Sequence, residues 1–268
     1  MIRLVLIDVD GTLVGRNGVH PSTWDALARA HGRGVHVGLC TGRIGSGKAL
    51  EYARRVSPDG FHIFQNGAVV SRPGQPAEYT SLLPPASYRA LVAMSRREDE
   101  PLEVYSERRF FLERHSELTR VHVRFLELEP EIVDLDALPE PALRAQWVVD
   151  ESRWPHFRDL TATLGDVEVN PATAPWCPGT VFSNLTRVGT SKRSAMRWLV
   201  TRYGIGGSDV AMIGDAVNDL ETMRAAGLGI AMGNAEPRIK EIAAAVVADV
   251  DAGGLAEAID FALGEAAR

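Results

Sequence analysis

Acidic side chains directly follow two short apolar runs of the chain. Asp8 and Asp10 come after the run at residues 4–7, and Asp215 follows a similar run at residues 210–213. Asp8 and Asp10 are two positions apart, so they lie on the same side of an extended strand. Carboxylates that meet in one cleft raise one another's pKa unless a cation stands between them. A hard divalent ion such as Mg²⁺, completed by water and phosphate oxygens, would meet that need.

Groups suited to holding a phosphate accompany these carboxylates. Thr41 and Gly42 follow a third apolar run, and Lys192 stands at the start of a predicted helix. A hydroxyl, a backbone amide and an ammonium group can each donate a hydrogen bond to phosphate oxygens. A divalent cation combined with such donors is an arrangement used for phosphoryl transfer. Further candidates in the same loops are Arg43, Asn218 and Asp219.

The apolar runs that precede these loops predict strands buried on both faces. The predicted strands cover residues 4–7, 35–39, 61–64, 210–213, 228–232 and 246–248. Helical patterns lie between them, at residues 22–32, 50–56, 191–203, 219–226, 237–245 and 255–263. Strands that alternate with helices predict a parallel sheet. Because the carboxyl ends of such strands carry the ligand site, we expect the candidate residues to meet at one edge.

The middle of the chain has a different pattern, with prolines clustered between residues 84 and 187. Strands are predicted at residues 103–106, 109–112 and 181–185, and helices at 86–96 and 154–164. The acidic, proline-bearing segment at residues 127–141 is predicted to be a solvated surface. These elements indicate an α+β insertion in an α/β frame. We therefore expect a core at residues 1–83 and 188–268, with the insertion at residues 84–187.

Four loop motifs resemble those of the haloacid dehalogenase (HAD) superfamily. They are Asp8-Val9-Asp10-Gly11-Thr12, Leu39-Cys40-Thr41-Gly42-Arg43, Lys192, and Gly214-Asp215-Ala216-Val217-Asn218-Asp219. Two more, Asn66-Gly67-Ala68 and Ala231-Met232-Gly233-Asn234-Ala235, are similar to the Cof-type branch with a class IIB cap. The resemblance implies a Rossmann-like core whose inserted domain caps the site and selects the substrate. Arg193 and the pair Ala216-Val217 depart from the usual glycine and glycine–acid pair, and neither change removes a reactive group.

The resemblance also implies a Mg²⁺-dependent phosphatase that acts on a small soluble phosphomonoester. Asp8 would attack phosphorus to form an aspartyl-phosphate, and Asp10 would protonate the leaving alcohol and then activate water. Mg²⁺ would be held by Asp8, Asp215 and the backbone carbonyl of Asp10, with Asp219 or Asn218 reaching it through water. The implied phosphate-binding groups are Thr41, Gly42, Lys192 and Asn218, and the implied substrate contacts are Arg43 and Asn66.

Two other functions stay open on the sequence. A mutase would transfer the phosphoryl group to another sugar hydroxyl, but comparable mutases carry their cap between the first two motifs. The span between Asp10 and Thr41 is too short for a cap. A phosphate-ester-binding regulator with vestigial hydrolysis is the second alternative, and the intact reactive residues argue against it. The insertion offers Arg109, His122 and Arg124 as weaker candidates for substrate contacts.

Composition and charge exclude several other partners. The 268 residues carry a formal net charge of −6 without a basic block, which disfavours nucleic acid and anionic membranes. The longest apolar run, residues 242–248, is far shorter than the roughly 20 residues of a membrane span. The first residues do not resemble a secretory signal, so we expect a cytoplasmic protein. Cys40 and Cys177 are expected to be reduced thiols, and only Cys40, in the second motif, is a candidate for a reactive one.

Overall fold

The computed structural model describes residues 1–174 and 177–265, which form two compact units. The first unit contains residues 1–43 and 49–79 and the described residues from Ser191 onward. The second contains the described residues of 44–48 and 80–190. The sequence predicted residues 44–48 in the core, but they belong to the second unit. Ile44 packs there in a cluster that includes Tyr105 and Phe110.

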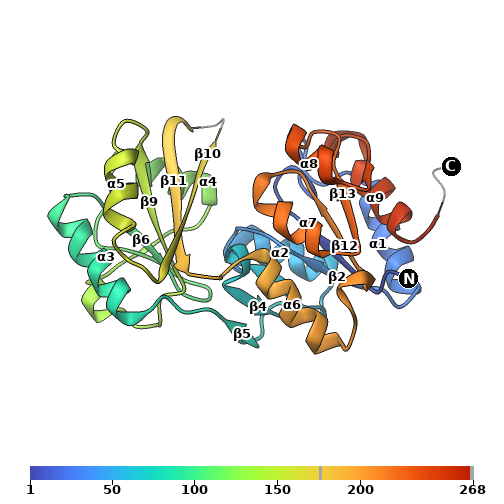
Figure 1. The fold of residues 1–268 in the computed structure, drawn as a ribbon, viewed down its shortest axis with the longest axis horizontal. Coiled ribbons are helices and arrows are strands. Elements are labelled where there is room, and N and C mark those ends of the chain that lie inside the picture. Colours follow the sequence, from blue (N-terminus) through green and yellow to red (C-terminus); the bar gives the residue numbers. More distant parts are fainter. Residues whose placement is uncertain (175–176, 266–268) are drawn as a thin grey trace. The chain divides into compact units, whose positions relative to one another are not determined.

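A parallel five-stranded sheet forms the centre of the first unit (Figure 1). Its strands are β1 (Leu4–Ile7), β2 (His36–Leu39), β12 (Val210–Gly214), β13 (Leu228–Ala231) and β14 (Ala245–Val246). The order is β14-β13-β12-β1-β2, so β1 pairs with both β12 and β2. Both of these neighbours are in register with β1, which brings the loops that follow the three strands to one edge of the sheet.

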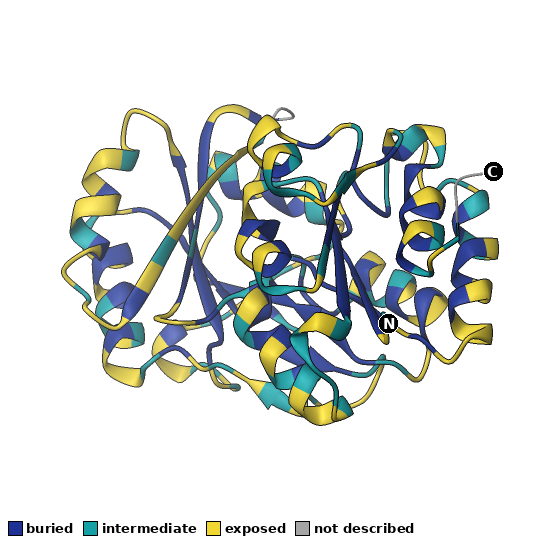
Figure 2. Cartoon of the chain, turned by 45° about the vertical axis from the view of Figure 1, so that its right-hand side comes forward, coloured by how far each residue is buried: buried dark blue, intermediate teal, exposed yellow. Residues whose placement is uncertain are grey.

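Helices connect these strands and bury one face each, while their outer faces stay exposed (Figure 2). They are α1 (Ser22–Gly32), α2 (Gly47–Val56), α6 (Lys192–Tyr203), α7 (Leu220–Ala225), α8 (Pro237–Ile242) and α9 (Gly254–Ala262). In α1 the buried side chains recur at helical spacing, at Thr23, Ala26, Leu27 and Ala30. The predicted α/β core with a parallel sheet is confirmed.

The third predicted strand departs from this parallel arrangement. β3 (His62–Phe64) is not a strand of the main sheet, to which an isolated bridge between Cys40 and Ile63 joins it, and it opens a separate sheet with β4 (Val69–Ser71) and β5 (Tyr79–Thr80). The reason is the turn at Gln65–Gly67, whose three residues all have positive φ and reverse the chain. β3 and β4 are therefore antiparallel.

A buried histidine ties β3 to the main sheet. His62 Nδ1 accepts a hydrogen bond from the backbone amide of Leu39, 3.0 Å away, and Nε2 donates to the carbonyl of Ser57 at 2.9 Å. This pair of bonds requires the neutral imidazole, because a protonated Nδ1 could not accept. Burial lowers the pKa of His62 to about 4, so the ring stays neutral at neutral pH.

The second unit contains a six-stranded sheet of order β10-β11-β9-β6-β7-β8. The strands are β6 (Leu102–Tyr105), β7 (Phe110–Leu112), β8 (Glu131–Ile132), β9 (Arg144–Asp150), β10 (Val167–Ala174) and β11 (Cys177–Arg187). Its helices are α3 (Pro85–Arg97), α4 (Glu117–Leu126) and α5 (Trp154–Thr161). Side chains such as Trp147 and Phe157 form the apolar core on one face of the sheet. This unit is the predicted α+β insertion.

Three strands and one helix of the second unit escaped prediction. They are β8, β9, β10 and α4. The prediction of a solvated surface at residues 127–141 is wrong at one point: Leu135 is 1% exposed and belongs to the apolar core. The side chain is carried inward by the short helical turn Leu135–Ala137, which Asp134 caps. In the described residues, no helix is long and apolar enough to cross a membrane.

Candidate active site

Three carboxylates converge at the carboxyl end of the parallel sheet. Asp8 immediately follows β1, and Asp215 and Asp219 follow the neighbouring strand β12. One oxygen atom from each carboxylate lies within 4.8 Å of the chosen oxygens of the other two. Asp8 and Asp219 are buried, whereas Asp215 is partly exposed. The structure therefore brings together the carboxylate side chains of Asp8, Asp215 and Asp219, which were predicted to hold the metal directly or through water.

Lys192 supplies a positive charge inside this cluster. Its Nζ donates to Asp8 Oδ1 at 2.6 Å and to Asp219 Oδ1 at 2.7 Å. Burial by itself would lower the pKa of Lys192, but the charges of Asp219 and Asp8 raise it above its ordinary value. Lys192 is the first residue of α6, and Ser191 caps that helix by accepting a hydrogen bond from the amide of Ser194 at 3.1 Å. The ammonium group is thus held in place and stays protonated.

Asp8 is held in a site that disfavours its charge. Burial is the main cause that raises the pKa of Asp8 well above its ordinary value, and the nearby charge of Lys192 opposes it. Asp219 and Asp215 raise the pKa of Asp8 further, because a like charge disfavours ionisation. The anionic form of Asp8, which a nucleophile needs, therefore depends on Lys192 and on any further cation that binds.

Asp215 is the member of the cluster that lacks a cationic partner. Lys192 forms ion pairs with Asp8 and Asp219 but, among the residues that the structure describes, none joins it to Asp215. Burial raises the pKa of Asp215 to about 6, and a hydrogen bond from Thr12 Oγ1, 2.8 Å long, opposes this rise. A Cβ on Gly11 would lie only 2.2 Å from Asp215 Oδ2, so glycine is required for this approach.

Asp219 orders the loop that carries Asp215. Its Oδ2 accepts hydrogen bonds from the backbone amides of Asp215 and Ala216, at 3.2 and 3.3 Å. Its Oδ1 binds Lys192. A Cβ on Gly214 would lie 2.4 Å from Asp219 Oδ2, which explains the glycine at the end of β12. Asp219 is therefore a positioning residue for both the loop and the lysine.

The structure places the Asp10 side chain outside the carboxylate cluster. Asp10 is exposed, and its two oxygens accept hydrogen bonds from Arg43 Nε at 2.9 Å and Nη2 at 2.5 Å. Arg43, for which the resemblance implied a substrate contact, forms an ion pair with Asp10 here. In this arrangement the Asp10 side chain is not one of the clustered metal-ligating groups. It is a carboxylate oriented by a two-pronged ion pair at the rim of the site.

The remaining predicted residues form a connected loop cluster. Thr41 Oγ1 accepts a hydrogen bond from the backbone amide of Arg43 at 3.1 Å. Asn66 lies against Gly42, where an added Cβ would meet its side-chain amide at 3.1 Å. Asn218 Nδ2 donates to Asn66 Oδ1 at 3.3 Å. The loops that follow β2, β3 and β12 are thereby joined.

Two residues with structural roles at this site were quoted in the motifs without a predicted role. Thr12 binds Asp215 as described, and Asn234 bridges two loops. Asn234 Nδ2 donates to the carbonyl of Gly11 at 2.7 Å, and its Oδ1 accepts from the amide of Val250 at 3.0 Å. The available signal was the side-chain amide of Asn234 inside the motif Ala231-Met232-Gly233-Asn234-Ala235.

Cys40 does not have the environment of a reactive thiol. It is completely buried after β2, and burial raises the pKa of its thiol far above the ordinary range. Lys192 lowers the pKa of the thiol, but not enough to reverse this effect. Since the thiolate is the nucleophilic form, Cys40 is an inert core residue.

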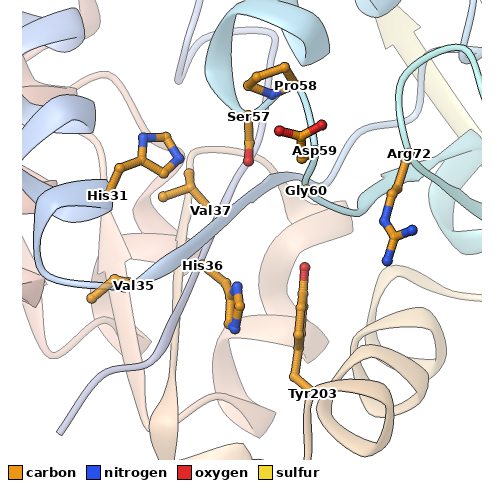
Figure 3. A pocket seen from close by; sticks show the side chains of 10 residues that line it. All are labelled: His31, Val35, His36, Val37, Ser57, Pro58, Asp59, Gly60, Arg72 and Tyr203. Atoms are coloured by element: carbon orange, nitrogen blue, oxygen red, sulfur yellow. The ribbon is translucent and has the colours of Figure 1, made fainter.

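The first unit also contains a cavity of about 540 Å³ that is separate from these carboxylates (Figure 3). Its lining includes His31, His36, Arg72 and Tyr203. His36 is the first residue of β2, so the cavity lies at the amino end of that strand, whereas Thr41 follows its carboxyl end. The chemistry predicted from the motifs is not located in this cavity.

Comparisons with known proteins agree with the site geometry. Residues 5–259 match the family model of haloacid dehalogenase-like hydrolases. A phosphoglycolate phosphatase of Methanosarcina acetivorans is 27% identical over 97% of this chain and 96% of its own length. The structure of a HAD phosphatase from Bacteroides thetaiotaomicron is 25% identical, with a TM-score of 0.84 over 98% of this chain and 95% of that one. A HAD subclass IIB sugar phosphatase shares the fold at 23% identity, with a TM-score of 0.79 over 97% and 98% of the two chains.

The match over most of the chain defines the class of protein. The chain belongs to the haloacid dehalogenase-like hydrolase family. The chain shares the fold of the subclass IIB sugar phosphatase, as the resemblance of its motifs implies. The predicted enzyme class, a phosphatase hydrolase of this superfamily, is likewise confirmed by the family match and the phosphatase relatives.

Proposed function

We propose that the protein is a cytoplasmic, Mg²⁺-dependent phosphatase that hydrolyses a small phosphomonoester through a covalent intermediate on Asp8. The observation that supports this most strongly is the buried contact of Asp8 with Lys192 beside Asp215 and Asp219. Four chemically distinct roles must be filled: nucleophile, proton carrier, phosphate binding and metal binding. The described loops supply a group for each.

Asp8 acts as the nucleophile. Its Oδ1 is bound by Lys192, which keeps the carboxylate anionic against the effect of burial. One oxygen attacks phosphorus as the bond to the leaving alcohol breaks, and the product is an acyl phosphate on Asp8. Water then attacks the same phosphorus, which releases phosphate and regenerates the carboxylate. The barrier falls because one difficult displacement becomes two easier ones.

Asp10 carries the proton in both steps. It gives a proton to the leaving oxygen and then takes one from the attacking water. Arg43 donates to both oxygens of Asp10, and each oxygen keeps a second lone pair with which it can carry a proton. Arg43 is thus a positioning residue that orients Asp10 until the substrate arrives.

The phosphoryl group is held by donors from three loops. Lys192 contributes the charged donor, and the hydroxyl of Thr41 and the amide of Gly42 contribute neutral ones. Asn218, already joined to Asn66, adds a further amide. These donors stabilise the charge on the phosphoryl oxygens without reorganisation, because the loop hydrogen bonds preposition them.

Asp8 and Asp215, with the backbone carbonyl of Asp10, are the groups that would hold Mg²⁺. The donor set fits the ion, since oxygen ligands suit a hard divalent cation and Asp215 lacks a cationic partner among the described residues. When bound, Mg²⁺ neutralises charge on the transferred phosphoryl group. Asp219 keeps the loop of Asp215 in shape for this binding.

The second unit selects the substrate in this proposal. The groups that perform the chemistry lie in the first unit, and a relative of almost equal length is a phosphoglycolate phosphatase. We therefore expect a soluble metabolite of similar size, and neither nucleic acid nor a membrane, as the partner.

Phosphate release from a panel of phosphorylated metabolites, measured with and without EDTA, tests the proposal. We expect EDTA to abolish activity, Mg²⁺ to restore it, and Ca²⁺ to inhibit because its looser coordination misplaces the reacting groups. Asp215→Asn should raise the Mg²⁺ concentration that gives half-maximal activity by about tenfold or more. Asp25→Asn, an exposed change in α1, is the control and should leave that concentration unchanged. Full activity in EDTA would refute the metal requirement.

A further inference from the structure

An arginine in the second unit is buried without a carboxylate partner. Arg144, the first residue of β9, is 6% exposed. In the part of the chain that the structure describes, no ion pair reaches it and its Nε has no hydrogen-bond partner. Burial lowers the pKa of Arg144, which reflects the cost of keeping a guanidinium away from water. Buried charges in proteins are normally paired, so this one calls for an anion.

The side chains around Arg144 fix the plane and direction of its guanidinium. The group lies over the ring of Tyr105, with its central carbon 3.9 Å from the ring centroid. Nη1 donates to Asn184 Oδ1 at 2.5 Å. The ring thus covers one face of the guanidinium, and the Nε edge is left for another acceptor. An arginine used in this way can bind both oxygens of a carboxylate.

Thr186 provides a second, independent observation at the same place. It pairs directly with Arg144 across β11 and β9, so both side chains lie on the same face of the sheet. Thr186 is 2% exposed, and its Oγ1 also has no partner among the described residues. Asn184 orients the guanidinium at this place, because its oxygen accepts the hydrogen bond from Nη1 of Arg144. The unused groups are therefore mostly hydrogen-bond donors, which suits an acceptor-only ligand.

Two carboxylates lie on this face: the charge of Glu103 raises the pKa of Arg144, but Glu103 is paired with His122 instead, with 2.9 Å between Nδ1 and Oε2. Glu103 Oε2 accepts hydrogen bonds from Tyr105 and from Gln146, at 2.8 and 3.0 Å. Glu168, which pairs with Thr186, accepts from the amide of Gly189 at 3.2 Å. Neither forms an ion pair with Arg144 among the described residues. One guanidinium can therefore bind the two oxygens of one carboxylate group of a ligand.

We propose that Arg144, Thr186 and Asn184 form a binding site for the carboxylate group of a small metabolite. The site is argued from the second unit alone. One source of this carboxylate is the substrate, if it is a phosphomonoester that also bears a carboxylate. This assignment rests on the proposed function. The other source of the same chemistry is a free carboxylate that binds as an effector.

Thermal unfolding with sodium malonate, in EDTA and against sodium chloride of equal ionic strength, tests the site itself. We expect malonate to raise the melting temperature of the wild type. Arg144→Met should weaken malonate binding about tenfold to a hundredfold, because hydrogen bonds to a charged group are lost. Arg158→Met, an exposed arginine of α5 that pairs only with its neighbour Asp159 among the described residues, is the matched control. It should bind malonate like the wild type.

Thr186→Val separates binding from folding. It removes a buried hydroxyl that has no partner, so the stability without malonate should stay the same or rise. Malonate binding should still weaken. If malonate stabilises the wild type no more than chloride does, the site is refuted. It is also refuted if Arg144→Met and Thr186→Val keep the full malonate shift.

Kinetics then identify the source of the carboxylate. The readout is kcat/KM for phosphoglycolate relative to phenyl phosphate, which lacks a carboxylate. A loss of this preference in Arg144→Met, through KM rather than kcat, assigns the carboxylate to the substrate. An unchanged preference together with lost malonate binding assigns it to a free ligand. Absence of turnover in the wild type would refute the proposed phosphatase function, while the malonate experiment would still decide on the site.

Discussion

Replacing Lys192 with methionine keeps the length of the side chain and removes its ammonium group. Asp8 and Asp219 then lose their partner at 2.6 and 2.7 Å, in places where they are 5% and 0% exposed. Removing one partner of a buried ion pair costs about 3–5 kcal/mol, and here two carboxylates lose the same partner. A domain of this size loses about 2–4 °C in melting temperature for each kcal/mol. We therefore expect Lys192→Met to melt roughly 10 °C or more below the wild type at pH 7.

The sign of the pH dependence distinguishes this electrostatic cause from lost packing. Without Lys192, the pKa of Asp8 in the folded protein rises further above its value in the unfolded chain. A raised pKa means that the folded state binds a proton more readily, so the penalty shrinks as pH falls. The difference between the variant and the wild type should narrow on going from pH 7 towards pH 5.

Thermal unfolding in EDTA of four proteins tests this reasoning. They are the wild type, Lys192→Met, the double variant Lys192→Met/Asp219→Asn, and the control Lys240→Met. The double variant should recover part of the lost stability, because one of the two orphaned charges is gone. Lys240, which donates to the carbonyl of Gly233, should cost far less. A Lys192→Met protein as stable as the wild type at pH 7, or one whose deficit grows on acidification, would refute the reasoning.

Two further predictions concern the first unit. Burial lowers the pKa of His62 to about 4 from its ordinary 6.5, so the stability it contributes is lost as pH falls through this window. Acid lowers the free energy of unfolding of the wild type, and His62→Gln should reduce this loss by at most about 3 kcal/mol. His31→Gln, a change at an exposed residue, should not reduce it. Gly67 has φ +98°, and a Cβ there would lie 2.0 Å from the carbonyl oxygen of Ser191. Gly67→Ala should therefore shift the start of α6 and lower both activity and stability. Gly34→Ala, at a position with a similar φ and open space, should lower stability alone. Equal effects of the two changes on activity would contradict this.

The core was predictable because its strands carry a plain signal. Residues 4–7 and 210–213 are short apolar runs between loop residues, and both strands are buried throughout. Since the chain order of such strands implies a parallel sheet, the convergence of Asp8 and Asp215 followed from the sequence alone. Lys192, at the start of a predicted helix, was assigned to the site by its charge and by the resemblance, and its contacts needed the structure.

The features that escaped prediction have no apolar run or residue spacing that would reveal them. β9 begins Arg144-Ala-Gln146, and these polar residues hide a strand that is buried at all but its last position. β10 is mostly exposed, so it has no apolar run to reveal it. The pairing of Asp10 with Arg43 depends on how two loops are shaped, which spacing along the chain does not encode. Leu135 is buried because a short helical turn within the acidic segment directs its side chain into the apolar core, where Val133 and Leu138 also pack.

The central claim is that Asp8 becomes phosphorylated during turnover. The direct test is to quench the enzyme with acid while it hydrolyses a phosphate ester carrying radiolabelled phosphorus, and to locate the label by peptide mapping. The account predicts label on the peptide containing Asp8, sensitive to alkali as an acyl phosphate is, and none in Asp8→Asn, which should lose activity by several orders of magnitude. Label on another residue, turnover without any labelled enzyme, or an Asp8→Asn variant that keeps more than about a tenth of the activity would contradict the account.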